Sequence, residues 1–282
     1  MAFKLAFASN AMKRYSLDEA IDLVADAGYQ GIEILLDPPH AFPPHVKDAD
    51  IKRWREKLKK RGLAVSNCNA FMLYGIEGCH RPSWCERDPR RRALRVEHTR
   101  QCLHLASKLG SPTISTEPGG PIDPGVTRKQ AADWFEEGLR SVLPDAEKAG
   151  VRLCIEPEPG LLIEHGSEYE EFIQRFAGDK VADRWLGLNF DVGHFYCVGD
   201  DPAVMAAQFK GRTHHIQIED IAKDRVHFHL VPGDGAIDFD RFFMNLRATK
   251  YEGWITVELY TFEHKAVEVA QRAREFLAKY VS

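Results

Sequence analysis

The sequence predicts an α/β fold, a (β/α)8 TIM barrel that forms a single domain over residues 1–282. Eight short apolar segments are each followed by a segment with helical periodicity, which is typical of a parallel sheet with helices outside it. A barrel of this class takes ~250 residues, and the chain has 282. A doubly wound open sheet is the alternative, but no Gly-rich phosphate fingerprint follows an early strand.

The expected strands are short, and most of them alternate apolar with polar residues. In the second strand, Ile32, Ile34 and Leu36 share one face. Glu33 and Asp37 share the other, because successive strand side chains point to opposite sides. The eight strands are expected at residues 4–9, 31–37, 63–70, 112–117, 152–158, 186–191, 213–220 and 254–260.

Start and stop signals place the helices between these strands. Capping boxes, in which Ser or Thr is followed three residues later by Glu or Gln, indicate helix starts at Ser16, Thr127 and Ser167. The long irregular segment 71–88 carries aromatic residues and is interpreted as a lid. The helices are expected at about residues 17–27, 50–61, 91–109, 127–149, from 167, from 202, 238–246 and 265–280.

Composition and charge exclude several classes of protein. A formal net charge of -4 and a pI of about 6.3 argue against a nucleic-acid-binding surface. No apolar run reaches the ~18 residues that a membrane helix needs, and the N-terminal apolar run is too short for a signal peptide. The six cysteines include no C-x-x-C pair, so we expect reduced thiols in a cytoplasmic protein.

Acidic and polar side chains share the inner face of the last four predicted strands. The parity rule places the aliphatic residues of these strands toward the helices and the polar residues toward the barrel axis. Strands two and four add Glu33 and Glu117 on the inner side. The inward residues of the last four strands are Cys154, Glu156, Glu158, Asn189, Asp191, His215, Gln217, Glu219, Thr256, Glu258 and Tyr260.

Inward carboxylates near the carboxyl ends of the strands lie where barrel enzymes keep their active sites. A lone strand-end Glu is more often a salt-bridge partner, and a lone buried His is more often a core group than a ligand. Acids from several strands, however, repel one another unless a cation neutralises them. Oxygen ligands favour Mn²⁺ or Mg²⁺, whereas Co²⁺ or Zn²⁺ remains open because His215 and His229 are near. The oxygen ligands expected are Glu156, Asp191, Gln217 and Glu258.

Five motifs in order give the chain a family resemblance. They are IEPEPG (155–160), NFDVGH (189–194), HIQIED (215–220), HLVPGDGAIDF (229–239) and WITVELY (254–260). Together they make the whole chain, residues 1–282, similar to the xylose isomerase-like TIM-barrel superfamily of sugar isomerases and epimerases. That group includes ketose 3-epimerases, hydroxypyruvate isomerases, inosose dehydratases and endonuclease IV-type nucleases.

The resemblance implies roles for individual residues. Glu156 and Glu258 would act as catalytic acid and base, besides binding the metal with Asp191 and Gln217. Ketose epimerases carry His where this chain has Gln217, but the His-Ile-Gln-Ile form is similar to hydroxypyruvate isomerases. The residues expected to contact the substrate are His194, Glu158, His229 and Lys223.

Two departures from the family pattern leave questions open. The arginine that epimerases carry downstream of the seventh strand is not plainly matched, and Lys223 and Arg225 are its candidates. Endonuclease IV-type enzymes bind extra zinc through an Asp and a His before the Gly-rich turn. His227 and His229 stand there in this chain, so the resemblance leaves a second metal open.

The expected function is a divalent-metal-dependent sugar or keto-sugar isomerase or epimerase that works through a metal-stabilised enediolate. The alternative is a lyase of the same superfamily, a dehydratase or an enzyme that cleaves a C–C or C-glycosidic bond of a keto-sugar or cyclitol. An endonuclease IV-type nuclease, an inactive binding subunit and a phosphorylated substrate are disfavoured. The expected partner is a small carbohydrate, with no nucleic acid and no membrane, and the sequence leaves a homo-oligomer open.

Overall fold

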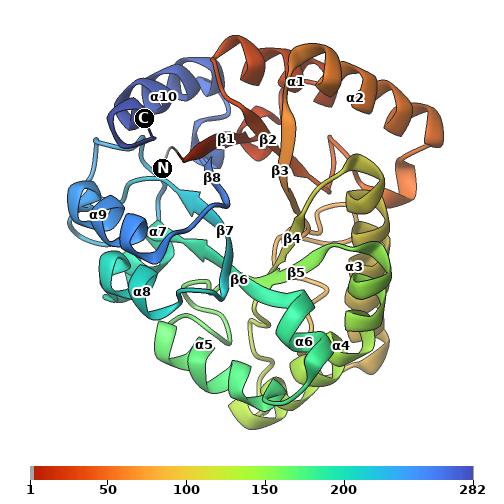
Figure 1. Cartoon of the computed structure of the whole chain (residues 1–282). Coiled ribbons are helices and arrows are strands. Elements are labelled where there is room, and N and C mark those ends of the chain that lie inside the picture. Colours follow the sequence, from red (N-terminus) through yellow and green to blue (C-terminus); the bar gives the residue numbers. More distant parts are fainter. Residues whose placement is uncertain (1–2, 282) are drawn as a thin grey trace.

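The computed structural model describes residues 3–281 and shows a closed barrel of eight parallel strands. The strands follow one another around the barrel in chain order, and β8 pairs with β1 to close it (Figure 1). The predicted fold class is therefore confirmed. The strands are β1 (Lys4–Ala8), β2 (Gly31–Leu35), β3 (Ala64–Asn69), β4 (Thr113–Thr116), β5 (Arg152–Ile155), β6 (Leu186–Asp191), β7 (Thr213–Ile218) and β8 (Trp254–Val257).

Helices surround the barrel and cover the outer face of the sheet (Figure 1). Short 3-10 helices η1 (Ser9–Met12), η2 (Pro43–His45), η3 (Gln174–Phe176) and η4 (Tyr260–Phe262) lie in the connections. The α-helices are α1 (Leu17–Asp26), α2 (Asp48–Arg61), α3 (Pro89–Leu109), α4 (Arg128–Ala149), α5 (Gly166–Ile173), α6 (Lys180–Trp185), α7 (Val192–Val198), α8 (Pro202–Gln208), α9 (Phe239–Thr249) and α10 (Ala266–Val281).

Capping explains where several helices begin. The boxes at Ser16 and Thr127 are present as predicted. The prediction at Ser167 is wrong, because α5 starts one residue earlier with His165 as its N-cap. Glu168 accepts the backbone N–H groups that precede the helix. Helices α6 and α7 were not predicted, since they are too short to show a periodic pattern.

The two faces of the strands differ as the parity rule predicts. Outward residues such as Leu153, Ile216 and Ile218 are buried in the hydrophobic core between sheet and helices. Inward residues such as Asn189 and His215 are polar, and both are 0% exposed. The interior of the barrel is therefore a hydrogen-bonded polar layer, which supports the carboxyl end of the barrel from below.

Most predicted strands end earlier than expected at the carboxyl end. β5 stops at Ile155, so Glu156 and Glu158 stand just beyond it. The Glu156 N–H still donates to Thr116 O at 3.1 Å, while the Glu158 N–H turns to Ile163 O at 2.9 Å. The backbone thus leaves the ladder where these acids begin, which places them at the mouth of the barrel.

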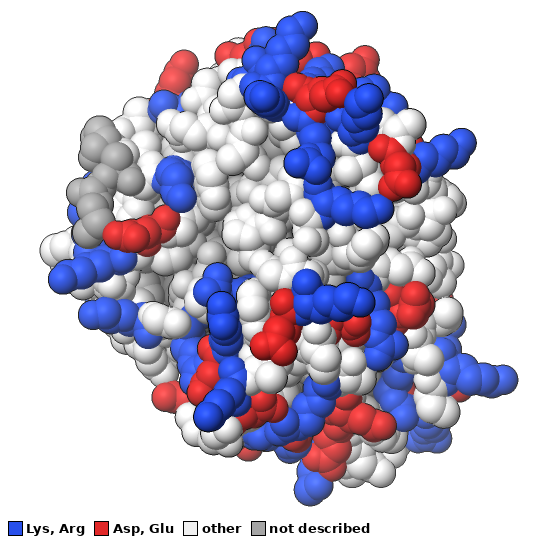
Figure 2. Space-filling model, turned by 45° about the vertical axis from the view of Figure 1, so that its right-hand side comes forward, with Lys and Arg blue, Asp and Glu red and all other residues white. Residues whose placement is uncertain are grey.

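The surface agrees with the charge balance of the sequence. In the face that Figure 2 displays, basic and acidic side chains are intermixed around the molecule. Among residues 3–281, no helix is both long and apolar enough to cross a membrane.

Candidate active site

A cavity of about 180 Å³ opens at the carboxyl ends of the strands. Its walls come from the segments that follow β1, β3, β5, β6, β7 and β8, as expected for an active site on this fold. The lining residues are Lys13, Asn69, Phe71, Met72, Tyr74, Cys79, His80, Glu156, Glu158, His194, His227, Glu258 and Tyr260.

The predicted acids converge at this cavity and are buried. Glu156 and Glu258 are each 3% exposed, and Asp191 is 0% exposed. Burial, followed by the charge of Glu258, raises the pKa of Glu156 well above its usual value. Burial and then the charge of Glu33 do the same for the pKa of Glu258. Burial also raises the pKa of Asp191 to about 6. These acids therefore need either protons or a cation.

The donor set at the cavity fits a divalent metal ion. Asp191 Oδ1 accepts a hydrogen bond from the His194 N–H at 2.7 Å, and Asp191 Oδ2 has no partner among residues 3–281. Glu156, Asp191 and His194 each offer one ligand atom, and these atoms lie within 4.8 Å of one another. His194 Nδ1, which faces the two acids, donates to Pro157 O at 2.9 Å, so the carboxylates are the available donors. Carboxylate oxygens are ligands that Mg²⁺ and Mn²⁺ prefer.

Gln217 lies among the predicted ligands, but its amide is engaged by protein groups. Its Oε1 accepts from Asn189 Nδ2 at 2.5 Å. Its Nε2 donates to Glu33 Oε1 and to Glu258 Oε1, both at 2.8 Å. In this arrangement the amide nitrogen faces Glu258, so Gln217 would have to rotate its amide to ligate a metal. Its role as a ligand stays a prediction.

His215 belongs to the layer below the cavity. Its Nδ1 lies 2.7 Å from Asn189 Oδ1, and its Nε2 lies 2.8 Å from Thr256 Oγ1. Burial lowers the pKa of His215 to about 3. With both ring nitrogens engaged, His215 orients Asn189, which in turn donates to Glu156 Oε2 at 2.6 Å.

Three imidazoles and Glu158 form the wall beside the acids. Glu158 Oε2 lies 3.2 Å from His194 Nε2, and Glu158 Oε1 lies 3.5 Å from His227 Nδ1. His229 Nδ1 donates to Glu258 O at 2.9 Å, and its Nε2 lies 3.2 Å from His227 Nε2. Ligand atoms of His194, His227 and His229 lie within 4.8 Å of one another. The second metal that the resemblance left open at His227 and His229 stays a prediction, with His194 as a third neighbour.

Some predicted residues lie elsewhere. Lys223 is exposed in the segment after β7 and is not among the residues that line the cavity, so its contact with substrate stays a prediction. Glu33 faces the interior as expected. Glu117 turns away from the axis instead: it accepts hydrogen bonds from Ser83 Oγ and the Trp84 N–H, and lies 3.8 Å from Arg95.

Two residues after β1 were missed by the sequence analysis. Asn10 Nδ2 donates to Glu258 Oε1 at 2.8 Å. Lys13 lines the cavity, and its Nζ lies 2.7 Å from Glu263 Oε1. Their position just past a strand end was the available signal, but the parity rule does not extend to the 3-10 helix that carries Asn10.

The segment between β3 and α3 lines the cavity, where a lid would lie. Hydrogen bonds to the rest of the protein hold this segment in place. Asp37 accepts the N–H groups of Tyr74 and Gly75 at 2.5 and 2.9 Å. Arg95, which is 0% exposed, donates to three carbonyl oxygens of the segment. These carbonyls belong to Ala70, Phe71 and Pro82. The bonds favour a fixed wall over a moving lid.

The Gly-rich turn before α9 is filled by the protein itself. Asp220 accepts the backbone N–H groups of Gly233, Gly235 and Ile237 at 2.9–3.1 Å. Backbone N–H groups in such a turn would otherwise suit a phosphate. The carboxylate of Asp220 takes that place, so these three N–H groups are already engaged. The expectation that the substrate is not phosphorylated stays a prediction.

Comparisons with known proteins bear on the family and the fold of the chain. The family described as "Xylose isomerase-like TIM barrel" matches residues 21–280. An inosose dehydratase of Mesomycoplasma hyopneumoniae (strain J) is 24% identical over 297 residues, covering 95% of this chain and 89% of that protein.

Solved structures show the same fold. A D-psicose 3-epimerase crystallised in the presence of D-fructose has a TM-score of 0.80 and 17% identity, covering 99% of both chains. The IOLI protein with a bound zinc atom has a TM-score of 0.79 and 18% identity, covering 99% of this chain and 100% of that one. At this identity the likeness shows the fold alone.

Proposed function

The chain belongs to the xylose isomerase-like TIM barrel family, and from this premise we propose a divalent-metal-dependent isomerase or epimerase of a sugar or keto-sugar. The protein would remove a proton from the carbon next to a carbonyl group and return a proton to the neighbouring carbon or to the other face. Membership of this family and the buried acids that line the cavity support this proposal.

The pair Glu156 and Glu258 carries the proposal. The two acids follow different strands, β5 and β8, yet both line one small cavity. Each is oriented by amide donors: Glu156 Oε2 by Asn189, and Glu258 Oε1 by Asn10 and Gln217. A substrate held between them would meet one carboxyl group from each strand, which is what removal and return of a proton requires.

The remaining groups bind and orient. When bound, a divalent ion would stabilise the negative charge that develops on the substrate oxygens as the C–H proton leaves. Glu156, Asp191 and Glu258 would hold it, with Gln217 after rotation of its amide. His194 is fixed by its Nδ1–H bond to Pro157 O at 2.9 Å, and it would contact a substrate hydroxyl through Nε2. Aromatic walls at Phe71 and Tyr260 would exclude water.

Dehydration is the second candidate, and Glu158 favours it. Burial, followed by the charge of Asp191, raises the pKa of Glu158 well above its usual value, so this carboxyl group can carry a proton. It lines the cavity beside His194 and could protonate a departing hydroxyl group. The similarity to an inosose dehydratase over 95% of the chain supports the same reading.

One experiment tests the shared step and separates the two outcomes. The protein, supplied with Mn²⁺, is incubated in D₂O with D-fructose, D-psicose and inosose, and the products are followed by NMR. Isomerase or epimerase activity predicts a new ketose or aldose with solvent deuterium at the reacting carbon. Dehydratase activity predicts loss of water from inosose alone. Absence of turnover and of deuterium exchange across a wider keto-sugar panel would contradict both.

A further inference from the structure

His80 is an imidazole at the cavity to which the proposed reaction gives no role. It lines the cavity from the segment between β3 and α3. Its Nδ1 is buried and has no hydrogen-bond partner among residues 3–281. Its Nε2 likewise makes no hydrogen bond within this part of the chain, but Nε2 is not buried. Nε2 is therefore the ring nitrogen that a molecule in the cavity can reach.

The proton of this imidazole belongs on Nε2. Burial, followed by the positive charge of Arg95, lowers the pKa of His80 below its usual value, so the ring is neutral at pH 7. A neutral imidazole carries one N–H, and its other nitrogen is an acceptor. A buried N–H without an acceptor is rare and costly, so the bare lone pair is better placed on Nδ1. His80 thus offers a neutral N–H donor at the cavity.

The short turn that carries His80 is held in place. The Gly78 N–H donates to Arg81 O at 3.1 Å, and the Arg81 N–H donates to Gly78 O at 3.4 Å. Arg81 Nη1 also donates to Glu86 Oε1 at 2.7 Å, and Glu86 is buried. The ring of Phe71 meets the imidazole edge to face, with the two centroids 5.9 Å apart. These contacts fix the position of the donor before a substrate binds, which lowers the cost of binding.

The wall formed by His80 and Lys13 carries no net charge, which indicates the kind of substrate group it would hold. Lys13 is the one Lys or Arg among residues 3–281 that lines the cavity. Its Nζ lies 2.7 Å from Glu263 Oε1, so the two charges offset each other. A carboxylate or phosphate group is normally held by an unpaired cation, whereas neutral donors suit hydroxyl groups. This wall therefore fits the hydroxyl groups of an uncharged sugar.

We propose that His80 determines specificity by donating its Nε2–H to a hydroxyl group of the substrate tail. The tail is the part of a keto-sugar beyond the carbonyl carbon and the two carbons next to it. This role rests on the proposed function, in which Glu156 and Glu258 act on those first carbons. It names the substrate class as an uncharged ketose longer than dihydroxyacetone, which consists of those carbons alone and has no tail.

Three substitutions at His80 separate the two ring nitrogens. His80→Gln places an amide N–H near the position of Nε2, His80→Asn places one near Nδ1, and His80→Phe keeps a ring without a donor. Turnover of D-psicose and D-fructose, and deuterium exchange of dihydroxyacetone, are followed by NMR with added Mn²⁺. His80→Phe and His80→Asn are expected to lower kcat/KM for the ketoses about fivefold, the effect of losing one hydrogen bond. His80→Gln should stay within about twofold, and exchange of dihydroxyacetone should be unchanged in all three variants.

A second measurement does not depend on turnover. Whole protein labelled with ¹⁵N in its histidines is compared with His80→Gln, whose spectrum identifies the resonances of His80. At pH 7 the ring is expected to be neutral with its proton on Nε2. D-Fructose should shift the His80 resonances, and dihydroxyacetone should leave them in place.

The outcomes distinguish a failure of this role from a failure of the proposed function. A proton on Nδ1, or resonances that D-fructose leaves in place, would overturn the role of His80. Wild-type kcat/KM for the ketoses in His80→Phe would overturn it too, and would leave the proposed function intact. If D-fructose shifts His80 while no substrate exchanges deuterium, the proposed reaction is wrong and the binding role stands. Circular dichroism checks that each variant is folded, and the wild-type spectra decide if a variant is not.

Discussion

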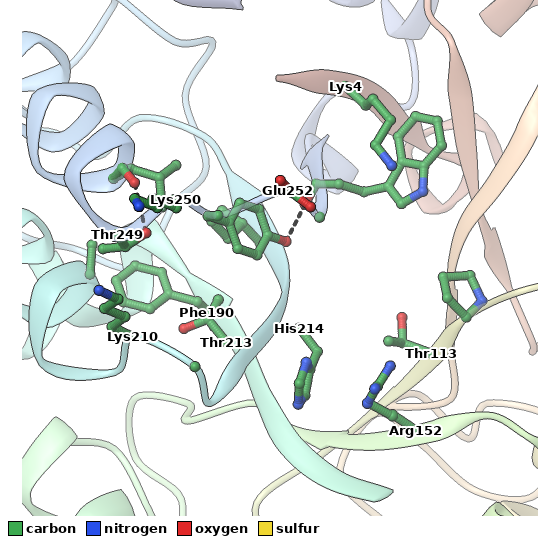
Figure 3. Close-up of a pocket in the computed structure, with 18 residues that line it drawn as sticks. Lys4, Thr113, Arg152, Phe190, Lys210, Thr213, His214, Thr249, Lys250 and Glu252 are labelled. Carbon is green, nitrogen blue, oxygen red and sulfur yellow. Dashed lines mark hydrogen bonds between the residues drawn. The ribbon is translucent and has the colours of Figure 1, made fainter. Parts of the chain in front are cut away.

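The two ends of the barrel hold cavities of opposite character. The amino-end cavity is the larger, about 430 Å³, and exposed lysines lie around it (Figure 3). Its polar groups are satisfied locally, as when Tyr251 Oη donates to Trp254 O at 2.8 Å. The carboxyl-end cavity is about 180 Å³ and holds buried acids. His80 lines this cavity, and Asp191 and Glu219 lie beside the cavity. Each of these three residues has a buried polar atom without a hydrogen-bond partner among residues 3–281.

This difference teaches that the site we propose is not in the larger of the two cavities. Among residues 3–281, none that lines the amino-end cavity has a buried side-chain polar atom without a partner. Unpartnered atoms of His80, Asp191 and Glu219 lie instead at or beside the smaller cavity, where a metal ion and a substrate would bind. On barrels of this class the amino end serves stability and the carboxyl end serves catalysis.

Metal removal should give the largest effect. Dialysis against a strong chelator is expected to reduce turnover to background, because the buried acids lose the cation that neutralises them. Restoring Mn²⁺ should restore activity, and a mock-dialysed sample is the control. Full activity in a sample shown by elemental analysis to be free of metal would remove the main distinction between the two cavities.

Substitution of the acid pair should come next. Glu156→Gln and Glu258→Gln are each expected to lower turnover by roughly 10²–10⁴, the usual contribution of a positioned acid or base. Both variants are assayed at saturating metal, so that weaker metal binding is not mistaken for lost chemistry. Glu158→Gln should cost less in an isomerase and comparably in a dehydratase. Near-normal turnover of Glu156→Gln or Glu258→Gln would show that the assignment of acid and base is wrong.

Two lysines allow a sharper test at the same end of the barrel. Lys13 lines the cavity and pairs with Glu263, whereas Lys223 is exposed outside it. Lys13→Met is expected to raise KM about tenfold, the effect of losing one charged hydrogen bond to substrate, with little change in kcat. Lys223→Met should leave both within about twofold. The reverse result would support the contact that the sequence predicted for Lys223.

The smallest effect is expected at the amino end. Lys210 is exposed at the amino-end cavity, and Lys210→Gln should change kcat/KM by no more than about twofold, as for a surface substitution away from the chemistry. Thermal unfolding of the variant is the control for its fold. A tenfold loss of kcat/KM in a stable variant would mean that this cavity takes part in the reaction.

Much of the fold could be predicted because strand and helix periodicities are local. The eight strands were found in order, and parity placed Glu156 and Glu258 on the inner face, where both line the cavity. Parity failed beyond the end of β4. β4 stops at Thr116, and Glu117 then turns toward Arg95, a contact that joins segments distant in sequence.

The sequence could not reveal which polar side chains remain without partners. Parity put Glu219 on the inner face, but its burial beside Asp191 appears only in the structure. Gln217 looked like a ligand, and the structure shows its amide divided between Asn189, Glu33 and Glu258. Such bonds join residues from four different strands, so no short stretch of sequence encodes them.

The buried Arg95 has a consequence for how this protein would select its substrate. If the segment between β3 and α3 moved away, the buried guanidinium group of Arg95 would lose its carbonyl acceptors inside the protein, which is energetically costly. Selection of the substrate would then depend on its fit to a preformed cavity of about 180 Å³, and not on closure of this segment after binding. Polymers and bulky glycosides would be too large for this cavity. Small free metabolites would enter and leave without a loop having to open first.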